Sequence, residues 1–463
     1  MEFVDRKEEL QELKRVLEDS PSPSFVVVYG RRRLGKSTLL KKALKQSDVF
    51  YMAGDFIETV QLKLIKEHLS NKFPLMKNIN ISSWEDLFNI LNSLTTEIFT
   101  LCLDEFPYIV KHSPGLPSVL QRFIDSKELK FNIVVCGSSQ RMMHKLVLSY
   151  AEPLYGRAKA IIKLSPIAIP YLQEVLKSDA ISTVEEYSVW GGVPRYWELR
   201  EEYHSLMEAI QGTMLSTISI LYDEPRRLFL DDLTSAVQSE SLMAVIAGGA
   251  NKLSEIASRM GRDATALSAP LDRLIQMNYL RREIPFGENP KKSKKSLYKI
   301  ADPFMNFYFT FIIPNLSFIA RGRKNLVLEL IKENLNAYIS YFWEYLCQEA
   351  VTGNFLFDHR WKEASRWWGS VQDNKEYKQL EVDVVAESMD GEAILIGECK
   401  WTNPEIAGSL FANLENKISL LPFTQDKKII PVLFLKNRPK DSADLSKCHI
   451  LYPEDIIKLS YSD

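Results

Sequence analysis

Residues 25–38 join an apolar, β-branched run to the pattern G-x-x-x-x-G-K-S and then to a helical pattern. This order of strand, glycine loop and helix is typical of a loop that binds polyphosphates. Gly30 and Gly35 let backbone N–H groups turn toward the phosphates, Lys36 can reach the β- and γ-phosphates, and the Ser37 hydroxyl can ligate Mg²⁺. The alternative is a glycine turn with an incidental lysine. The predicted nucleotide-binding residues are Gly30, Arg31, Arg32, Arg33, Leu34, Gly35, Lys36, Ser37 and Thr38.

Polar residues follow two later apolar runs, and an arginine precedes a third. Asp104 and Glu105 stand at the end of one run, where α/β folds place their active sites. Asp104 is predicted to hold Mg²⁺ through water and Glu105 to activate the attacking water, although two acids can also simply cap a strand end. Ser138 is predicted to contact the γ-phosphate or the water; the alternative is a plain turn. Arg157 is predicted to be an arginine finger, in cis or toward a neighbouring subunit, or else a surface arginine.

A second set of chemically capable residues lies at 379–401, where two apolar runs flank a turn at 390–391. This pattern predicts a β-hairpin. Since side chains two apart share one face of a strand, the hairpin can bring Asp383, Glu398 and Lys400 together. Two carboxylates suit Mg²⁺ or Mn²⁺, and a neighbouring lysine can position water or stabilise developing charge. The alternative is a solvent-facing hairpin with an ion pair.

The elements that position these residues change in kind along the chain. Up to residue 164, apolar runs alternate with helical patterns, which predicts a doubly wound parallel sheet. Helices follow, with a breaker at 191–194, and then a helix–turn–helix and two strand-like runs around a lysine-rich loop, which predict a winged helix. The predicted domains are a nucleotide-binding core at 1–168, a helical lid at 169–232, a winged helix at 233–302, a helical connector at 303–335 and a C-terminal α/β domain at 336–463.

Composition limits the class of protein. The 463 residues are 46% apolar and 25% charged, with a net charge of −2, as in a soluble protein of two to four domains. The sequence has scattered cysteines and neither a signal peptide nor an apolar run of about 20 residues, which predicts a cytoplasmic protein without a membrane span.

Residues 241–300 differ from the rest in charge, with eleven Lys or Arg against five Asp or Glu, a net of +6. The predicted partner of this segment is DNA, held mainly by Arg281, Arg282 and the lysines of 291–295. The alternatives are a lysine loop that is merely solvated and a winged helix that serves as an interaction module.

The nucleotide-site residues together resemble the AAA+/STAND-like branch of P-loop ATPases, and residues 3–10 resemble its F-x-x-R-x-x-E-L start. This resemblance implies Mg²⁺ held at Ser37 and Asp104. No N-K-x-D guanine motif occurs, which favours ATP over GTP. Because Arg157 could act on a neighbouring subunit, a homo-oligomeric ring stays possible.

Asp383 with Glu398-x-Lys400 resembles the PD-(D/E)xK nuclease superfamily, in which Glu344 matches an additional acid and Mg²⁺ or Mn²⁺ would lie at Asp383, Glu398 and Glu344. The usual proline before the first acid is replaced by Val382. Nearly the whole chain resembles the archaeal-type ATPase family. The implied fold is an α/β multidomain protein with a P-loop parallel-sheet ATPase core, a helical lid, a winged helix and a C-terminal restriction-endonuclease-like α/β domain.

Two main functions fit these observations. The first is a Mg²⁺-dependent ATPase coupled to DNA binding and DNA cleavage. The second is a nucleotide-operated switch whose C-terminal domain binds a partner without cleaving. A helicase or ring translocase is a third alternative, disfavoured because the sequence offers no second helicase-type motor domain.

Overall fold

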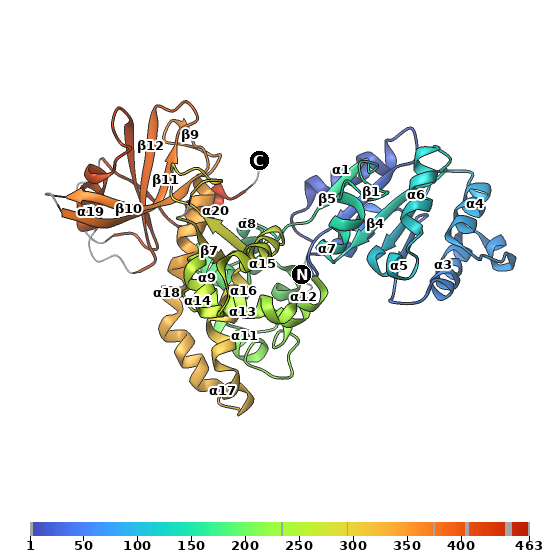
Figure 1. The fold of residues 1–463 in the computed structure, drawn as a ribbon, viewed down its shortest axis with the longest axis horizontal. Coiled ribbons are helices and arrows are strands. Elements are labelled where there is room, and N and C mark those ends of the chain that lie inside the picture. Colours follow the sequence, from blue (N-terminus) through green and yellow to red (C-terminus); the bar gives the residue numbers. More distant parts are fainter. Residues whose placement is uncertain are drawn as a thin grey trace.

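The computed structural model describes residues 3–232, 235–293, 295–373, 376–402, 407–439 and 447–461. Figure 1 shows an N-terminal sheet with its helices on one side, a helical body in the middle and a C-terminal sheet on the other side. The two five-stranded sheets have the orders β2-β3-β4-β1-β5 and β10-β11-β12-β13-β14. The α/β multidomain architecture predicted from the sequence is therefore confirmed.

The N-terminal domain is a parallel sheet, since each of its strand pairs runs parallel. Its strands are β1 (Phe25–Tyr29), β2 (Val49–Met52), β3 (Thr100–Asp104), β4 (Asn132–Gly137) and β5 (Ala160–Lys163). Its helices are α1 (Lys7–Glu18), α2 (Lys36–Ala43), α3 (Glu58–Lys72), η1 (Pro74–Asn78), α4 (Trp84–Leu94), α5 (Phe106–His112), α6 (Leu116–Asp125), α7 (Gln140–Met143) and η2 (His144–Leu148).

Both faces of this sheet are buried, which explains the continuous apolar runs in its strands. Val26 and Val28 of β1 point into one apolar cluster, together with residues of α1 and α2. Phe25 and Val27 point into a second cluster, together with residues of α3, α4 and α6. The period-two alternation of a strand thus fixes which helices cover which face, and leaves the C-terminal strand ends open for a site.

The middle of the chain is mostly helical. Its first part contains α8 (Ile169–Leu176), α9 (Ala180–Trp190), α10 (Pro194–Arg200), α11 (Leu206–Thr213) and α12 (Glu224–Asp232). Three helices and an antiparallel pair of strands follow: α13 (Ala236–Ala247), α14 (Leu253–Met260), α15 (Ala264–Gln276), β6 (Leu280–Glu283) and β7 (Leu297–Ile300). The last part contains α16 (Pro303–Phe307), η3 (Tyr308–Ile312), η4 (Ile313–Asn315), α17 (Leu316–Ala320) and α18 (Lys324–Val351).

The C-terminal domain is built on a mixed sheet. Strands β10, β11 and β12 pair antiparallel, whereas β13 and β14 run parallel to β12. Its elements are β8 (Phe355–Leu356), β9 (His359–Arg360), β10 (Ser365–Asp373), β11 (Glu376–Glu387), β12 (Ala393–Lys400), α19 (Ala407–Leu420), β13 (Lys428–Leu435), β14 (His449–Leu451) and α20 (Pro453–Leu459). The predicted boundary between residues 335 and 336 falls inside α18, a continuous 28-residue helix that belongs to both neighbouring parts.

One helical stretch of the described residues, Pro303–Ala320, is long and apolar enough to cross a membrane by length and composition. Its apolarity has another explanation, because 56% of it is buried inside the protein. Phe304, Phe307 and Phe311 of this stretch belong to the apolar cluster that continues from the N-terminal sheet through the helical body.

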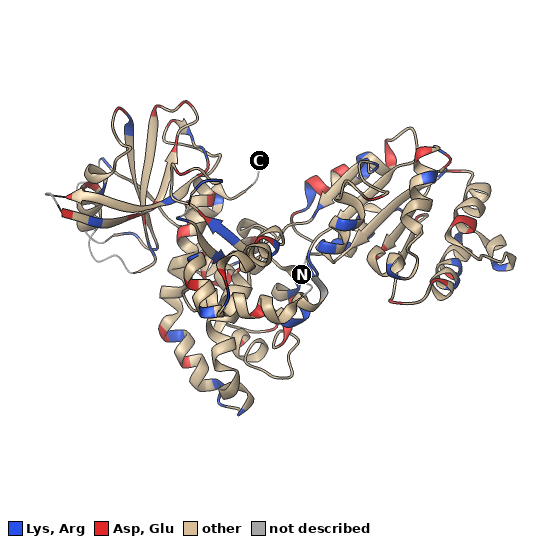
Figure 2. Cartoon of the chain, in the orientation of Figure 1, with Lys and Arg blue, Asp and Glu red and all other residues tan. Residues whose placement is uncertain are grey.

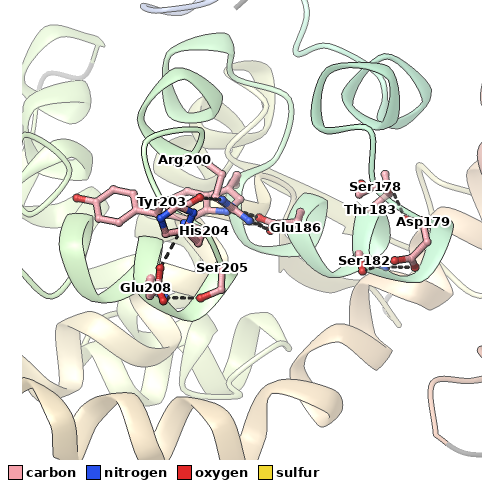
Figure 3. A network of polar contacts seen from close by, with 11 residues as sticks. Ser178, Asp179, Ser182, Thr183, Glu186, Arg200, Tyr203, His204, Ser205 and Glu208 are labelled. Carbon is pink, nitrogen blue, oxygen red and sulfur yellow. Dashed lines mark hydrogen bonds and ion pairs between the residues drawn. The ribbon is translucent and has the colours of Figure 1, made fainter.

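The core and the helical body meet at two glycines. The Ile167 N–H donates to the Gly192 carbonyl at 2.7 Å, and the Trp197 indole donates to the Gly191 carbonyl at 2.6 Å. A Cβ at Gly192 would lie 2.1 Å from the Ile167 carbonyl oxygen, so only glycine fits there. Nearby, Arg200 lies 2.6 Å from Glu186 and ties the end of α10 to α9 (Figure 3).

We expect Gly192→Ala to destabilise this junction by about 1–3 kcal/mol, because the added methyl overlaps backbone that cannot move independently. Thermal unfolding measures the loss. Gly115→Ala is the matched control, since Gly115 has ordinary helical dihedral angles and a methyl added there would meet nothing within 4 Å. Equal melting temperatures for the two variants would contradict the expectation.

Candidate nucleotide site and its connections

The phosphate-binding loop lies between β1 and α2, as the sequence predicts. Gly30 approaches β5 so closely that a Cβ would lie 2.7 Å from the Leu164 carbonyl oxygen. Gly35 has φ 86°, in the left-handed region that favours glycine, and immediately precedes α2. The buried Lys36 ammonium donates to the carbonyls of Gly30 at 2.8 Å and Arg31 at 3.0 Å. The lysine is therefore held inside the loop that is to receive the phosphates.

The hydroxyl and carboxylate predicted to bind Mg²⁺ are in direct contact. Ser37 Oγ donates to Asp104 Oδ2 at 2.7 Å, and Asp104 is buried at the end of β3. Oxygen ligands of these two kinds, completed by phosphate oxygens and water, fit Mg²⁺. Among the described residues no group of three or more His, Cys, Asp or Glu could hold a metal ion.

Glu105 and Ser138 also meet. Ser138 Oγ lies 2.8 Å from Glu105 Oε1 and 3.0 Å from Oε2, and thus binds the carboxylate across the tips of β3 and β4. Glu105 itself has φ 54°, an unusual conformation for a non-glycine residue and one that clusters at functional sites. Glu105 and Ser138, predicted separately at two strand ends, are therefore in direct contact, and their roles toward the γ-phosphate and the water stay predictions.

Arg157 lies before β5 as expected, and its guanidinium is bound elsewhere. It makes a bidentate pair with Asp125 at the end of α6, with N–O distances of 2.8 and 2.9 Å. The pair is solvent-exposed, and such pairs contribute little to stability and exchange readily. A role as an arginine finger requires Arg157 to leave Asp125.

The three arginines of the loop were predicted only as part of the nucleotide cradle, but their side chains point into other elements. Arg31 forms a buried ion pair with Asp302 at 2.5 Å. Arg33 pairs with Glu224, the first residue of α12, at 2.9 Å. Arg32 donates to the Tyr108 hydroxyl of α5 at 3.0 Å. We call Arg31, Arg33, Tyr196, Glu224 and Asp302 the loop latch.

Tyr196 of α10 connects the two ion pairs of the loop latch. Its hydroxyl accepts from Arg31 at 3.2 Å and donates to Glu224 at 3.2 Å. Burial alone would lower the pKa of Arg31, but the charge of Asp302 outweighs it and the pKa is raised well above its usual value. Burial raises the pKa of Glu224, although the charge of Arg33 opposes this shift. The latch thus joins the phosphate-binding loop to the helical body and to the residue before α16.

The second candidate site is the predicted hairpin of β11 and β12, which forms with Gly391 at φ 77° in its turn. Asp383 Oδ2 accepts from the Cys399 N–H at 2.9 Å. Lys400 Nζ lies 2.8 Å from Glu398 Oε1. The pairing register of β10 and β11 shifts between Ser365 and Trp367, opposite the segment 382–385 that contains Asp383, and such irregularities are common beside active sites.

The residues of this hairpin do not fit a metal ion as they stand. Lys400 takes one oxygen of Glu398, and Lys417 of α19 takes the other at 2.6 Å. Lys417 was missed from the sequence. Burial, followed by the charge of Glu398, raises the pKa of Asp383. The three predicted metal ligands, Asp383, Glu398 and Glu344, do not form a metal-binding group.

Glu344 of α18 provides a test by pH. Burial, and next the charge of Asp383, raises its pKa to about 7 from an ordinary value of 4.5. A raised carboxyl pKa stabilises the fold at low pH, and this contribution disappears as the pH rises through 7. We expect the unfolding free energy to fall by at most about 3 kcal/mol between pH 5 and pH 8.

Urea unfolding at pH 5 and pH 8 measures this effect. Glu344→Gln should lose most of the pH dependence, because glutamine carries no charge at either pH. Glu333→Gln, an exposed position on the same helix, is the control and should behave as the wild type. An unchanged pH dependence in Glu344→Gln would contradict the assignment.

The arginines and lysines predicted to bind DNA differ in how exposed their side chains are. Arg281 is partly buried, pairs with Glu283 at 3.0 Å and lies 4.1 Å from the Tyr345 ring of α18, so contact with DNA would require it to leave these partners. Arg282 is partly exposed and donates to Ser296 at 2.8 Å. Lys291 and Lys292 are exposed in the loop between β6 and β7, and Lys294 lies outside the described residues. Figure 2 shows the basic segments of this region between the helical body and the C-terminal sheet.

Comparisons with known proteins agree with the nucleotide site. A family described as an ATPase domain predominantly from Archaea matches residues 3–198, and a family of archaeal and bacterial proteins of unknown function matches residues 308–416. An uncharacterized protein of Methanocaldococcus jannaschii is 30% identical over 456 residues, which cover 96% of this chain and 98% of that protein.

Two shorter or more distant similarities point the same way. An uncharacterized ATP-binding protein of Methanocaldococcus jannaschii is 43% identical over 47 residues, 10% of this chain and 78% of that protein. The solved structure of a Walker-type ATPase of Pyrococcus abyssi is 21% identical with a TM-score of 0.50, and the match covers 66% of this chain and 96% of that chain. This structural similarity supports the fold alone.

Proposed function

Because the chain belongs to the archaeal-type P-loop ATPase family, which binds and hydrolyses ATP, we propose that its ATP cycle controls DNA binding by the helical and C-terminal parts. The observation that carries this proposal is the loop latch. Arg31 and Asp302 are 271 residues apart in sequence, yet they form one buried ion pair between the phosphate-binding loop and the end of the winged-helix region. Phosphates that reposition the loop would therefore act directly on that region.

The roles in ATP hydrolysis follow from the geometry of the site. Lys36 and the loop N–H groups bind the β- and γ-phosphates, while Ser37 and Asp104 would hold Mg²⁺, which neutralises phosphate charge. Water attacks the γ-phosphorus, the bond to the bridging oxygen breaks, and Glu105 accepts the proton of the water. Ser138 keeps the Glu105 carboxylate oriented through its hydrogen bonds.

DNA binding is supported by charge and by topology. Three helices followed by an antiparallel pair fit the winged-helix order, and residues 241–300 carry a net charge of +6. Because the phosphate contacts of such a module release counterions, its affinity should fall steeply with salt.

The test is DNA affinity measured by fluorescence anisotropy at 50 and 200 mM salt, in the presence of ADP and of a non-hydrolysable ATP analogue. We expect the affinities in the two nucleotide states to differ by at least about threefold, and ATP turnover to change on adding DNA. Equal affinities and an unaltered turnover would overturn the coupling. ATP turnover measured without DNA tests the ATPase activity separately. It should be present in the wild type and absent in Lys36→Ala.

The contact of Lys417 with Glu398 favours a second candidate function, in which the C-terminal domain binds a partner without cleaving DNA. Two ammonium groups on Glu398 leave the hairpin without a metal set, as expected of a C-terminal domain that binds without cleaving. Cleavage of supercoiled plasmid and single-stranded DNA with Mg²⁺ or Mn²⁺, comparing the wild type with Lys400→Ala, distinguishes the two. Cleavage that is lost in the variant would reject the inert domain, whereas the absence of cleavage would support it.

A further inference from the structure

A cleft of about 880 Å³ separates the winged-helix region from the C-terminal sheet. One wall consists of the first residues of α14 and α15 with β7 and the loop before it, and the other of β10 and β11. The walls are joined by a hydrogen bond from the Phe286 N–H to the Arg366 carbonyl at 2.9 Å and by contact of the Phe286 and Phe423 rings. Figure 1 shows the β7 region between the helices and the C-terminal sheet.

The cleft has the electrostatics of an anion site. Lys252, Arg282 and Lys295 line it, and no Asp or Glu is among the lining residues that the structure describes. Two of these cations have only exposed partners, since Lys252 lies 3.5 Å from Glu255 and Lys295 lies 2.8 Å from Glu288. Exposed pairs of this kind exchange readily for another anion. The first turns of α14 and α15 also face the cleft and add their positive dipole ends.

The same cleft offers flat aromatic surface. Trp368 of β10, which is only partly buried, lies in the lining together with Tyr298 of β7. These two features together can bind a nucleotide unit, because the cations attract its phosphate and the indole ring stacks on its base. The volume suits a small ligand or a short stretch of an extended chain, because ligand pockets span about 300–1,000 Å³.

We propose that this cleft binds single-stranded nucleic acid, with a base stacked on Trp368 and backbone phosphates on Lys252, Arg282 and Lys295. The proposal rests on the proposed DNA-coupled function and specifies its substrate. A strand is favoured over a free nucleotide because the three cations come from separate elements and because the exposed Lys291 and Lys292 continue the basic surface along the loop. Gln379 lines the cleft on β11, four residues before Asp383, about 13 Å along the strand.

The test uses the nucleotide-free full chain and fluorescein-labelled dT12, with an unlabelled duplex of the same length and thymidine monophosphate as competitors. Trp368→Ala should weaken dT12 binding about 5- to 100-fold, whereas Trp368→Phe should retain it. Tyr377→Ala is the control, because this exposed aromatic lies on β11 outside the cleft lining. Arg282→Ala should reduce the slope of log affinity against log salt by about one phosphate contact.

Each outcome decides the proposal. Competition by duplex as strong as by dT12, or wild-type affinity in Trp368→Ala, would overturn the single-strand cleft. Equal affinity for thymidine monophosphate and dT12 would identify a small-nucleotide site and overturn the strand. Thermal unfolding of each variant separates binding from folding. If dT12 binds as expected but its affinity is the same with ATP and with ADP, the single-strand site is supported and the proposed control of DNA binding by ATP is rejected.

Discussion

Lys36→Ala is expected to abolish ATP binding and to lower ATP turnover by at least about 100-fold while the fold is retained. The Lys36 ammonium is the charge at the centre of the loop, held by the carbonyls of Gly30 and Arg31. Alanine removes the contact with the β- and γ-phosphates, where negative charge is concentrated in a water-poor site. Because these loop carbonyls can turn to water when no nucleotide is bound, we expect little loss of stability.

The measurement combines isothermal titration with ATP and steady-state phosphate release. Lys41→Ala is the matched control, since Lys41 lies one turn further along α2, is exposed and packs 5.4 Å from the Phe50 ring. It should bind and hydrolyse ATP as the wild type does. Turnover in Lys36→Ala that remains at the wild-type level would mean that the activity comes from another site or from a contaminant.

The sequence could predict that Lys36, Ser37, Asp104 and Glu105 belong to one candidate site, and this has a physical cause. The loop chemistry is encoded within eight consecutive residues, and the acids are marked by the buried strand that they end. In a parallel sheet all such strand ends meet at one edge, which is why Ser138 is found against Glu105. The hairpin around Gly391 was predictable for the same reason, since its turn and both strands are local.

Contacts between distant segments were not predictable in this way. Arg31, Arg32 and Arg33 look alike in the sequence, and nothing local distinguishes the one that pairs with Asp302. The contact of Arg281 with the Tyr345 ring of α18 cannot be predicted from the residues of β6 alone. Lys417 lies 19 residues from Glu398, and only the packing of α19 on the sheet brings them together. Helices, strands and motifs follow local rules, whereas ion-pair partners follow from tertiary packing.

Asp302→Ala is the second change for which we expect a large effect, a loss of about 3–5 kcal/mol in the free energy of unfolding. The side chains of Arg31 and Asp302 are only 5% and 4% exposed, so removing the carboxylate leaves a buried guanidinium without its charge partner. Asp302 also caps α16 through the Met305 N–H at 2.7 Å. Asp302→Asn separates the two roles, because an asparagine oxygen keeps the cap while the charge is lost.

Chemical unfolding of Asp302→Ala, Asp302→Asn, Arg31→Met and the double variant Arg31→Met/Asp302→Asn measures the pair. The double variant should recover most of the stability lost in either single variant, because no unpaired charge remains buried. Asp125→Ala is the control: it breaks the exposed Arg157–Asp125 pair and should cost at most about 1 kcal/mol. Additive losses in the double variant would show that Arg31 and Asp302 are not coupled.

The same variants connect stability to function. If the loop latch transmits the nucleotide state, Arg31→Met/Asp302→Asn should fold and bind ATP yet give equal DNA affinity with ADP and with an ATP analogue. The wild type and Asp125→Ala should both keep the difference. The reason is that this buried ion pair connects two distant segments. Arg31 lies in the phosphate-binding loop, and Asp302 lies directly before α16. A double variant that still switches its DNA affinity would mean that the nucleotide acts through Glu224 and α12 alone.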